Sequence, residues 1–451
     1  MSGPHAGRSA LAAAATLLAF CSGAATAATS VTVYTRDLGF VREARVLQLV
    51  GARDTVRLAD IPERIDFSSV RLDPGGARVV RLAYRYDVSN GDALLDNARG
   101  SQIRLTLRGE RVVEGALVIS DGSWIVVRDA DGKLHTVPRG SVDDVRLGDA
   151  PSRIATRPAL EAVLEGARGG RVMAELAYLT GGLSWTAEHS VVRTGENGAS
   201  WSTAVSVENT TGRDFLDVDL KLVAGEPRRE AGSPAPLAPR MAMMTMGAEA
   251  KGADLSEQTF SEYHLYTLGR PATLRDRETQ KFTMLEPRAV KVTPRYLFRA
   301  AEGRGVRTQM EFRNTAAAGL GVPLPAGRVR FYEKDAAGDL QFTGETHIAH
   351  TPEGEKLTLD VGQAFDLVAE RRELFNRRVS DREREYGVEI KLRNQKKSDA
   401  TIVVEESAGG DVEVTQQSHP FTRKDANTLQ FDVPVAAGKE AVVSYTAHVR
   451  Y

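Results

Sequence analysis

The chain has 451 residues, of which 42% are hydrophobic and 26% are charged, and its 59 basic side chains nearly balance its 60 acidic ones. This balance disfavours partners that are recognised mainly by charge, so we expect no binding to nucleic acid or to an anionic membrane surface. The composition is that of an ordinary globular protein, and the length allows about three domains.

Residues 1–28 are organised like a secretory signal peptide. A positive residue, Arg8, precedes an apolar stretch at 11–20, and small residues follow it. This pattern predicts cleavage after Ala27 or Ala28 and a protein that is periplasmic or secreted.

The only cysteine, Cys21, lies inside that predicted signal peptide. Bulky Phe20 stands where a lipidated cysteine needs a small residue, which disfavours a lipoprotein. The mature chain would therefore contain no thiol, so it could use neither disulfides nor thiolate chemistry. No later apolar run approaches the ~20 residues of a membrane-spanning helix, so we expect no transmembrane segment after signal removal.

Apolar and polar residues alternate along most of the chain, and the alternating runs end at Gly, Asn, Asp or Pro. This period of two predicts antiparallel sheets with one buried and one solvated face. We expect a discontinuous N-terminal β-sandwich from residues 29–92 and 152–227. The best helical candidates are short, at 93–99 and 157–166.

Residues 93–151 form a predicted insert into that sandwich. Five short runs are separated by turn sequences that include Asp121-Gly122, and five strands at this spacing resemble a small SH3-like or Sm-like barrel. Trp124 in this insert is the candidate contact for a partner. The alternative, which we favour on general grounds, is that Trp124 fills the interior of a barrel too small to have much core.

Three segments share the order strand, Asn, polar turn, strand, with Asn209, Asn314 and Asn394 closing the first strand of each. An Asn side chain can bond the backbone of such a turn, so we interpret the repetition as structural rather than as three binding sites. Residues 259–451 are predicted to form a C-terminal immunoglobulin-like β-sandwich, whose last hairpin turns at Ala437-Gly438.

Between the two sandwiches, residues 228–258 are rich in Met, Pro and Ala. Their apolar residues follow neither the spacing of a strand nor that of a helix, which predicts a flexible linker. Its four methionines, at 241, 243, 244 and 246, could suit Cu(I). No His or Cys accompanies them, so a metal role is disfavoured and an adaptable loop is the simpler interpretation.

No local motif for catalysis stands out. Ser184 lacks the following glycine of a nucleophile elbow, and His347 and His350 would fall on opposite faces of a strand. We therefore assign no catalytic, cofactor-binding or metal-binding residues and expect no cofactor.

Six ordered blocks are similar to the exported bacterial proteins grouped as domain of unknown function 4139, a family related to mucoidy inhibitor proteins. They lie at 177–192, 219–226, 263–285, 321–335, 350–372 and 418–435. The resemblance implies no catalytic residues. The mucoidy-type relatives contain a long coiled coil, but this sequence has no sustained heptad repeat that would form one. His189 stands where the resemblance leads us to expect an aromatic residue.

Together these observations predict an all-β, non-enzymatic cell-envelope or secreted protein that binds a protein or glycan partner. This prediction rests on the modular sandwiches, on accessible edge strands and on the lack of a recognisable set of catalytic residues. The alternative is a cell-wall-directed hydrolase whose carboxylates are brought together only by the fold.

Overall fold

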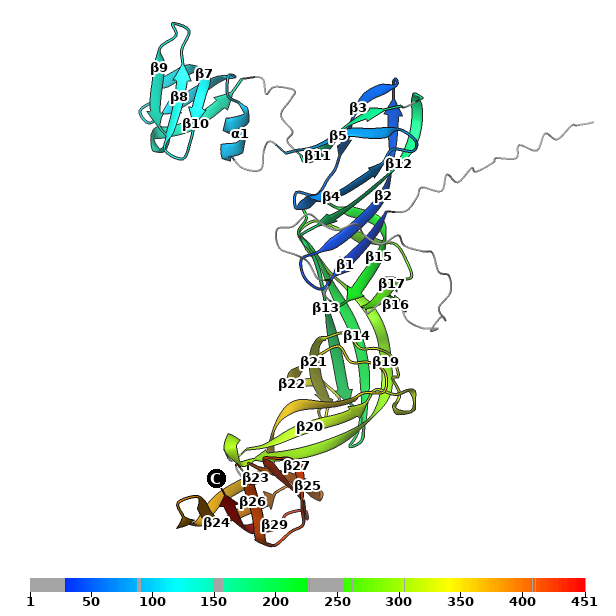
Figure 1. The fold of residues 1–451 in the computed structure, drawn as a ribbon, viewed down its shortest axis with the longest axis vertical. Coiled ribbons are helices and arrows are strands. Elements are labelled where there is room, and N and C mark those ends of the chain that lie inside the picture. Colours follow the sequence, from blue (N-terminus) through cyan, green and yellow to red (C-terminus); the bar gives the residue numbers. More distant parts are fainter. Residues whose placement is uncertain are drawn as a thin grey trace, which may run out of the picture.

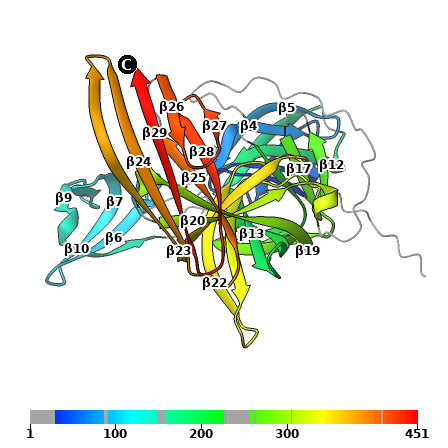
Figure 2. The same cartoon turned by 90° about the horizontal axis from the view of Figure 1, so that it is seen from below.

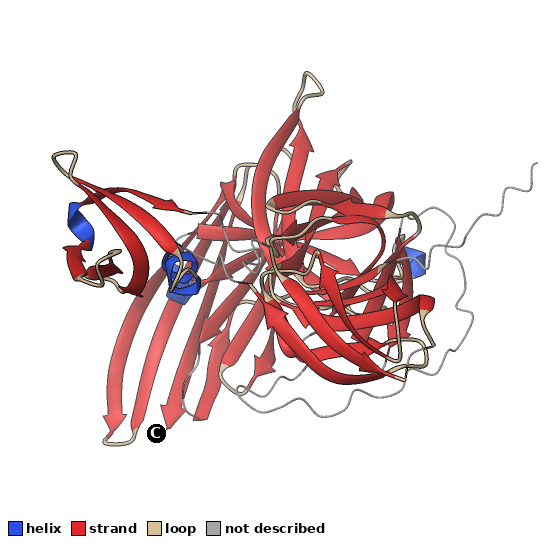
Figure 3. Ribbon diagram, turned by 90° about the horizontal axis from the view of Figure 1, so that it is seen from above, coloured by secondary structure: helices blue, strands red, loops and turns tan. Residues whose placement is uncertain are grey.

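The computed structural model describes residues 29–86, 91–148, 157–166, 168–225, 227, 255–260, 263–303, 305–407, 409 and 411–450. The predicted signal peptide, Cys21 and the four clustered methionines lie outside these residues. Almost everything described is β-strand, as Figure 3 shows in red, which confirms the predicted all-β class. Among the described residues, no helix is both long and apolar enough to cross a membrane.

An eight-stranded sheet forms most of what we call the N-terminal body, near the top of Figure 1. Its strands, in spatial order, are β16 (Leu255–Phe260), β17 (Tyr263–Leu268), β15 (Phe215–Ala224), β1 (Ser30–Tyr34), β2 (Gly39–Leu49), β12 (Gly170–Thr180) and β4 (Ile65–Asp73), with β18 (Ala272–Leu274) also on β15. Most pairs are antiparallel, but β1 and β15 are parallel, with Ser30 opposite Asp219.

A three-stranded sheet covers the core of this body from the other side. Its strands are β3 (Arg53–Ala59), β11 (Ala159–Glu165) and β5 (Arg78–Arg85). Side chains of both sheets form one apolar cluster, so the layout is sandwich-like. The helix predicted over 157–166 is wrong, because β11 pairs along its whole length with a strand on each side, and this pairing overrides its local helical propensity.

The insert begins with a short helix, α1 (Gly91–Asn97), which confirms the helix predicted at 93–99 with a shift of two residues. Five antiparallel strands follow, with an apolar cluster of their own. In spatial order they are β10 (Val142–Leu147), β6 (Gln102–Leu107), β7 (Val112–Ser120), β8 (Trp124–Arg128) and β9 (Leu134–Pro138), with the short 3-10 turn η1 (Arg139–Ser141) before β10. The two edge strands, β9 and β10, do not pair with each other in the described residues, so the sheet is not a closed barrel.

A thirteen-stranded sheet runs through the rest of the described chain. What we call the middle body contains β22 (Leu340–Ile348), β21 (Gly327–Lys334), β13 (Leu183–Arg193), β14 (Gly198–Asn209), β20 (Gly305–Arg313) and most of β19 (Glu278–Arg299). The 3-10 turns η2 (Ala300–Glu302) and η3 (Ala316–Ala318) flank β20. Strand pairing crosses the predicted sandwich boundary, because β13 and β14 lie beside β21 and β19.

The C-terminal body packs two layers around a second large apolar cluster. One layer has β23 (Lys356–Ser380), β24 (Glu383–Asn394), β29 (Glu440–Arg450) and β26 (Asp411–Gln417), and the other has β25 (Ala400–Ser407), β28 (Thr428–Val435) and β27 (Phe421–Asp425). Figure 2 shows β23 and β24 running together as a long hairpin. The final hairpin predicted at Ala437-Gly438 is wrong. Strand β28 pairs with strands of one layer and β29 with strands of the other, so the turn connects the two layers.

The three repeated asparagines are buried and bond backbone near the turns, as predicted. Each of Asn209, Asn314 and Asn394 is at most 1% exposed and donates both hydrogens of its side-chain amide to backbone carbonyl oxygens. The acceptors are the carbonyls of Arg213 and Leu274, of Val322 and Pro352, and of Ser398 and Val435, at 2.7 to 3.0 Å. One bonding pattern therefore fastens the connections that follow β14, β20 and β24.

Gly319, just after η3, marks a close approach of two backbones. Its φ is +104°, and a Cβ added there would lie 2.0 Å from the carbonyl oxygen of Ala289 in β19. Only glycine fits such a position without displacing the neighbouring strand.

Candidate functional site

Trp124, the sequence-predicted contact, lies at the surface of the insert. Its side chain is 46% exposed at the start of β8, while its neighbour Ile125 is 1% exposed. Exposed Ile119 and Leu134 belong to the strands on either side. The interpretation of Trp124 as a buried plug is therefore wrong, and its role as a partner contact stays a prediction.

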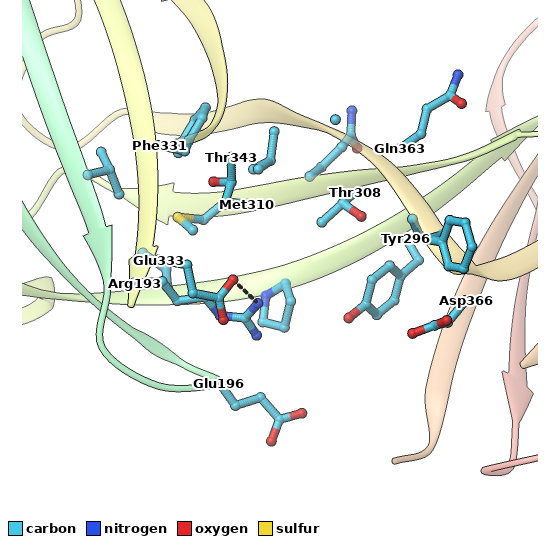
Figure 4. Close-up of a pocket in the computed structure, with 18 of the residues that line it drawn as sticks. Arg193, Glu196, Tyr296, Thr308, Met310, Phe331, Glu333, Thr343, Gln363 and Asp366 are labelled. Atoms are coloured by element: carbon cyan, nitrogen blue, oxygen red, sulfur yellow. Dashed lines mark ion pairs between the residues drawn. The ribbon is translucent and has the colours of Figure 1, made fainter. Parts of the chain in front are cut away.

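A groove of about 400 Å³ lies where the middle body meets the C-terminal body. Strands β13, β19, β20, β21, β22 and β23 contribute to its walls, and Lys396 comes from the loop after β24. Figure 4 shows Met310 and Phe331 at one end and Tyr296 and Asp366 at the other, with Thr308 between them. A volume of this size suits a small ligand or one segment of a polymer.

A bulge in β23 shapes the rim of this groove. Gln363 lies opposite Arg307 and Val368 opposite Gly305, so five residue steps on β23 (363 to 368) face only two on β20 (305 to 307). Bulges of this kind change the direction of side chains and often lie next to functional sites. Within the bulge, Phe365 lines the groove and is 96% exposed.

Polar side chains with no hydrogen bond to the described part of the chain accompany Phe365. They are Thr308, Thr343, Gln363 and Asp366, all of which line the groove. Figure 4 shows these four labelled side chains spread along it. Thr343, Gln363 and Asp366 are exposed and Thr308 is half-buried, so their polar atoms are accessible to a ligand in the groove.

The cations of the groove, in contrast, are already engaged. Arg193 Nη1 is 3.9 Å from Glu333 Oε2, the ion pair dashed in Figure 4. The Lys396 ammonium lies 4.4 Å from the ring centroid of Tyr296 and also contacts its hydroxyl. Each positive charge therefore has a partner within the chain.

His189, where the resemblance led us to expect an aromatic residue, is part of a buried hydrogen-bond chain. Its Nε2–H donates to the carbonyl of Pro325 at 3.1 Å, so its Nδ1 accepts from the Thr203 hydroxyl at 2.9 Å. Trp201 Nε1 donates in turn to the same hydroxyl, at 3.3 Å. Burial lowers the pKa of His189 to about 4, so the ring is neutral near pH 7. A second hollow, of about 390 Å³, lies beside it and includes the ion pair of Lys281 with Glu188.

The other sequence candidates are not brought together. Ser184 in β13 donates a long hydrogen bond, 3.4 Å, to Glu208. His350 Nδ1 accepts from the backbone N–H of Ala326, while His347 is an exposed residue of β22. Within the described ranges, no group of three or more His, Cys, Asp or Glu side chains could hold a metal ion.

Buried charges elsewhere are paired in ways that explain stability rather than chemistry. In the N-terminal body, Arg213 and Glu43 form a two-pronged ion pair at 2.8 and 3.1 Å, with both side chains under 10% exposed. Arg213 also donates to the Tyr178 hydroxyl at 2.6 Å. In the C-terminal body, buried Glu406 accepts from the Tyr445 hydroxyl at 2.8 Å. Such satisfied networks fix the packing of a core.

Comparison with known proteins places these features in a family. A search of curated proteins found no match. The profile of the family described as "Domain of unknown function (DUF4139)" matches residues 174–451, which is more than half of the chain. The match begins within β12 and includes every residue that lines the groove, whereas Trp124 and the insert lie before it. This chain therefore belongs to the DUF4139 family.

Proposed function

We propose that this protein is a non-enzymatic component of the cell envelope, periplasmic or secreted, that binds a partner in the groove between its middle and C-terminal bodies. The signal-like N-terminus supports the location. The position of the whole groove within the family region favours it over the insert as the binding site.

Phe365 is the observation that carries this proposal. A phenylalanine that is 96% exposed at the rim of a groove leaves nearly all of its ring in water. A ligand that covers such a ring gains about 1.5–3 kcal/mol, which corresponds to roughly a 10- to 150-fold gain in affinity. Apolar and polar side chains that converge in one concavity are typical of binding sites.

Site-specific photo-crosslinking in the intact cell tests the proposal. The full-length protein is made with p-benzoylphenylalanine in place of Phe365, of Trp124 or of Leu216, which is 62% exposed in the N-terminal body and serves as the matched control. We expect an adduct from position 365 and none from position 216. An adduct from position 124 alone would move the site to the insert and refute the groove.

A further inference from the structure

We propose that the groove binds a neutral saccharide chain, an inference that rests on the proposed function and names its ligand. A sugar ring has one apolar face of C–H groups and a rim of hydroxyls, so it needs a flat aromatic surface next to hydrogen-bonding side chains. The bulge of β23 provides this combination, with Phe365 between Gln363 and Asp366.

The unpaired polar groups match hydroxyls in donor and acceptor character. The hydroxyls of Thr308 and Thr343 and the side-chain amide of Gln363 can each donate and accept, while an ionised Asp366 accepts. A sugar hydroxyl also donates and accepts, so one ligand can satisfy all four side chains together. None of them has a hydrogen bond to give up first within the described residues.

The charges of the groove favour a neutral ligand over an anionic one. Its lining carries two basic residues, Arg193 and Lys396, against three acidic ones, Glu196, Glu333 and Asp366. Both basic groups already have partners in the chain. An acidic sugar or a phosphate would meet a net negative site in which Arg193 already has Glu333 as its counterion and the Lys396 ammonium is held against the Tyr296 ring, which opposes binding.

The apolar part of the lining favours a sugar over a peptide. Val191, Met310 and Phe331 are each at most 9% exposed, so the neighbouring side chains already cover them. A peptide anchors apolar side chains in open pockets, and these covered residues do not form one. Of the apolar lining residues, Phe365 is the most exposed, while Tyr296, Tyr332 and Val361 are half-buried.

A glycan array of neutral and anionic bacterial oligosaccharides, followed by calorimetry with the best hit, tests this inference on the full-length protein. We expect neutral hits, and an affinity that changes less than twofold between 50 and 500 mM NaCl. Phe365→Ala should weaken binding at least tenfold and Gln363→Ala several-fold, whereas Trp124→Ala, another exposed aromatic, should leave it unchanged. Near-total exposure of Phe365 means that its replacement leaves the fold intact, which circular dichroism would verify.

Absence of any hit, hits that are only anionic and disappear in salt, or equal binding by Phe365→Ala and the parent would each overturn the saccharide assignment. The crosslinking result separates this failure from a failure of the proposed function. A protein adduct from position 365 together with a blank array would leave the groove as the binding site but reject the sugar. A blank array without any adduct from position 365 would reject both.

Discussion

His189 should make the stability of the middle body depend on pH in a defined window. Burial holds its folded-state pKa at about 4, against 6.5 for an ordinary histidine. Between these two pH values the unfolded chain binds a proton that the folded chain does not. The stability contribution is therefore complete above about pH 6.5 and is lost as the pH falls towards 4.

The size of this effect follows from the two pKa values. The difference between a pKa of 6.5 in the unfolded chain and one of about 4 in the folded chain corresponds to roughly 3 kcal/mol of unfolding free energy. About 2.5 kcal/mol of this is lost by pH 4.5. Replacement by glutamine, His189→Gln, keeps a donor and an acceptor but removes the titration. The loss of unfolding free energy between pH 7.5 and 4.5 should then be smaller by about 2.5 kcal/mol than in the parent.

Urea unfolding followed by tryptophan fluorescence at four pH values measures this difference, since Trp201 belongs to the same hydrogen-bond chain. His419→Gln, which removes a histidine from the turn after β26, is the control and should keep the parental pH dependence. An NMR titration of the imidazole resonances gives the pKa directly. If the resonance missing from His189→Gln titrates in the parent at pH 6–7, the reasoning about burial is refuted.

Three further substitutions test the packing. Arg213→Met should lower the free energy of unfolding by up to about 3–5 kcal/mol because it removes the two-pronged partner of buried Glu43 and leaves Arg45 to pair with that carboxylate, while Arg42→Met, in an exposed pair, should change it by less than about 1 kcal/mol; equal losses in urea unfolding would contradict this. Asn394→Ala should cost about 1–3 kcal/mol, because the buried carbonyl of Val435 loses its donor whereas Ser398 is exposed and its carbonyl can bond water; a thermal midpoint equal to that of the parent would show that the bonds are dispensable. Gly319→Ala should destabilise more than Gly303→Ala, because both have positive φ but only the first meets a neighbouring backbone; similar midpoints would exclude the steric argument.

Local patterns in the sequence predicted the local features of this fold well. Period-two alternation indicated strands nearly throughout, and the repeated Asn209, Asn314 and Asn394 indicated turns held by side-chain amides. Pairing between distant strands was not predictable in this way, because alternation records which face is buried and not which strand lies alongside. The error at 157–166 has this origin, since its flanking strands β3 and β5 come from elsewhere in the chain.

The groove was missed for a related reason. Phe365 has the same odd-numbered phase as Leu367 and Ala369, which are at most 2% exposed, so alternation alone would place its ring in the core. The bulge shifts the phase and turns the ring outwards, and a bulge depends on the partner strand. At Trp124 the alternating positions of β8 are apolar on both faces, so the sequence did not settle which face was buried.

The parallel pairing of β1 with β15 has a consequence for the order in which the chain can fold. Ser30 pairs with Asp219, which lies 189 residues further along the chain (219 minus 30), so this part of the sheet closes a long loop of chain and should form late. The strands β6 to β10 pair with one another over short separations, so the insert can fold while the sheets of the N-terminal body are still incomplete. A folding intermediate would thus carry a finished module on an unfinished host.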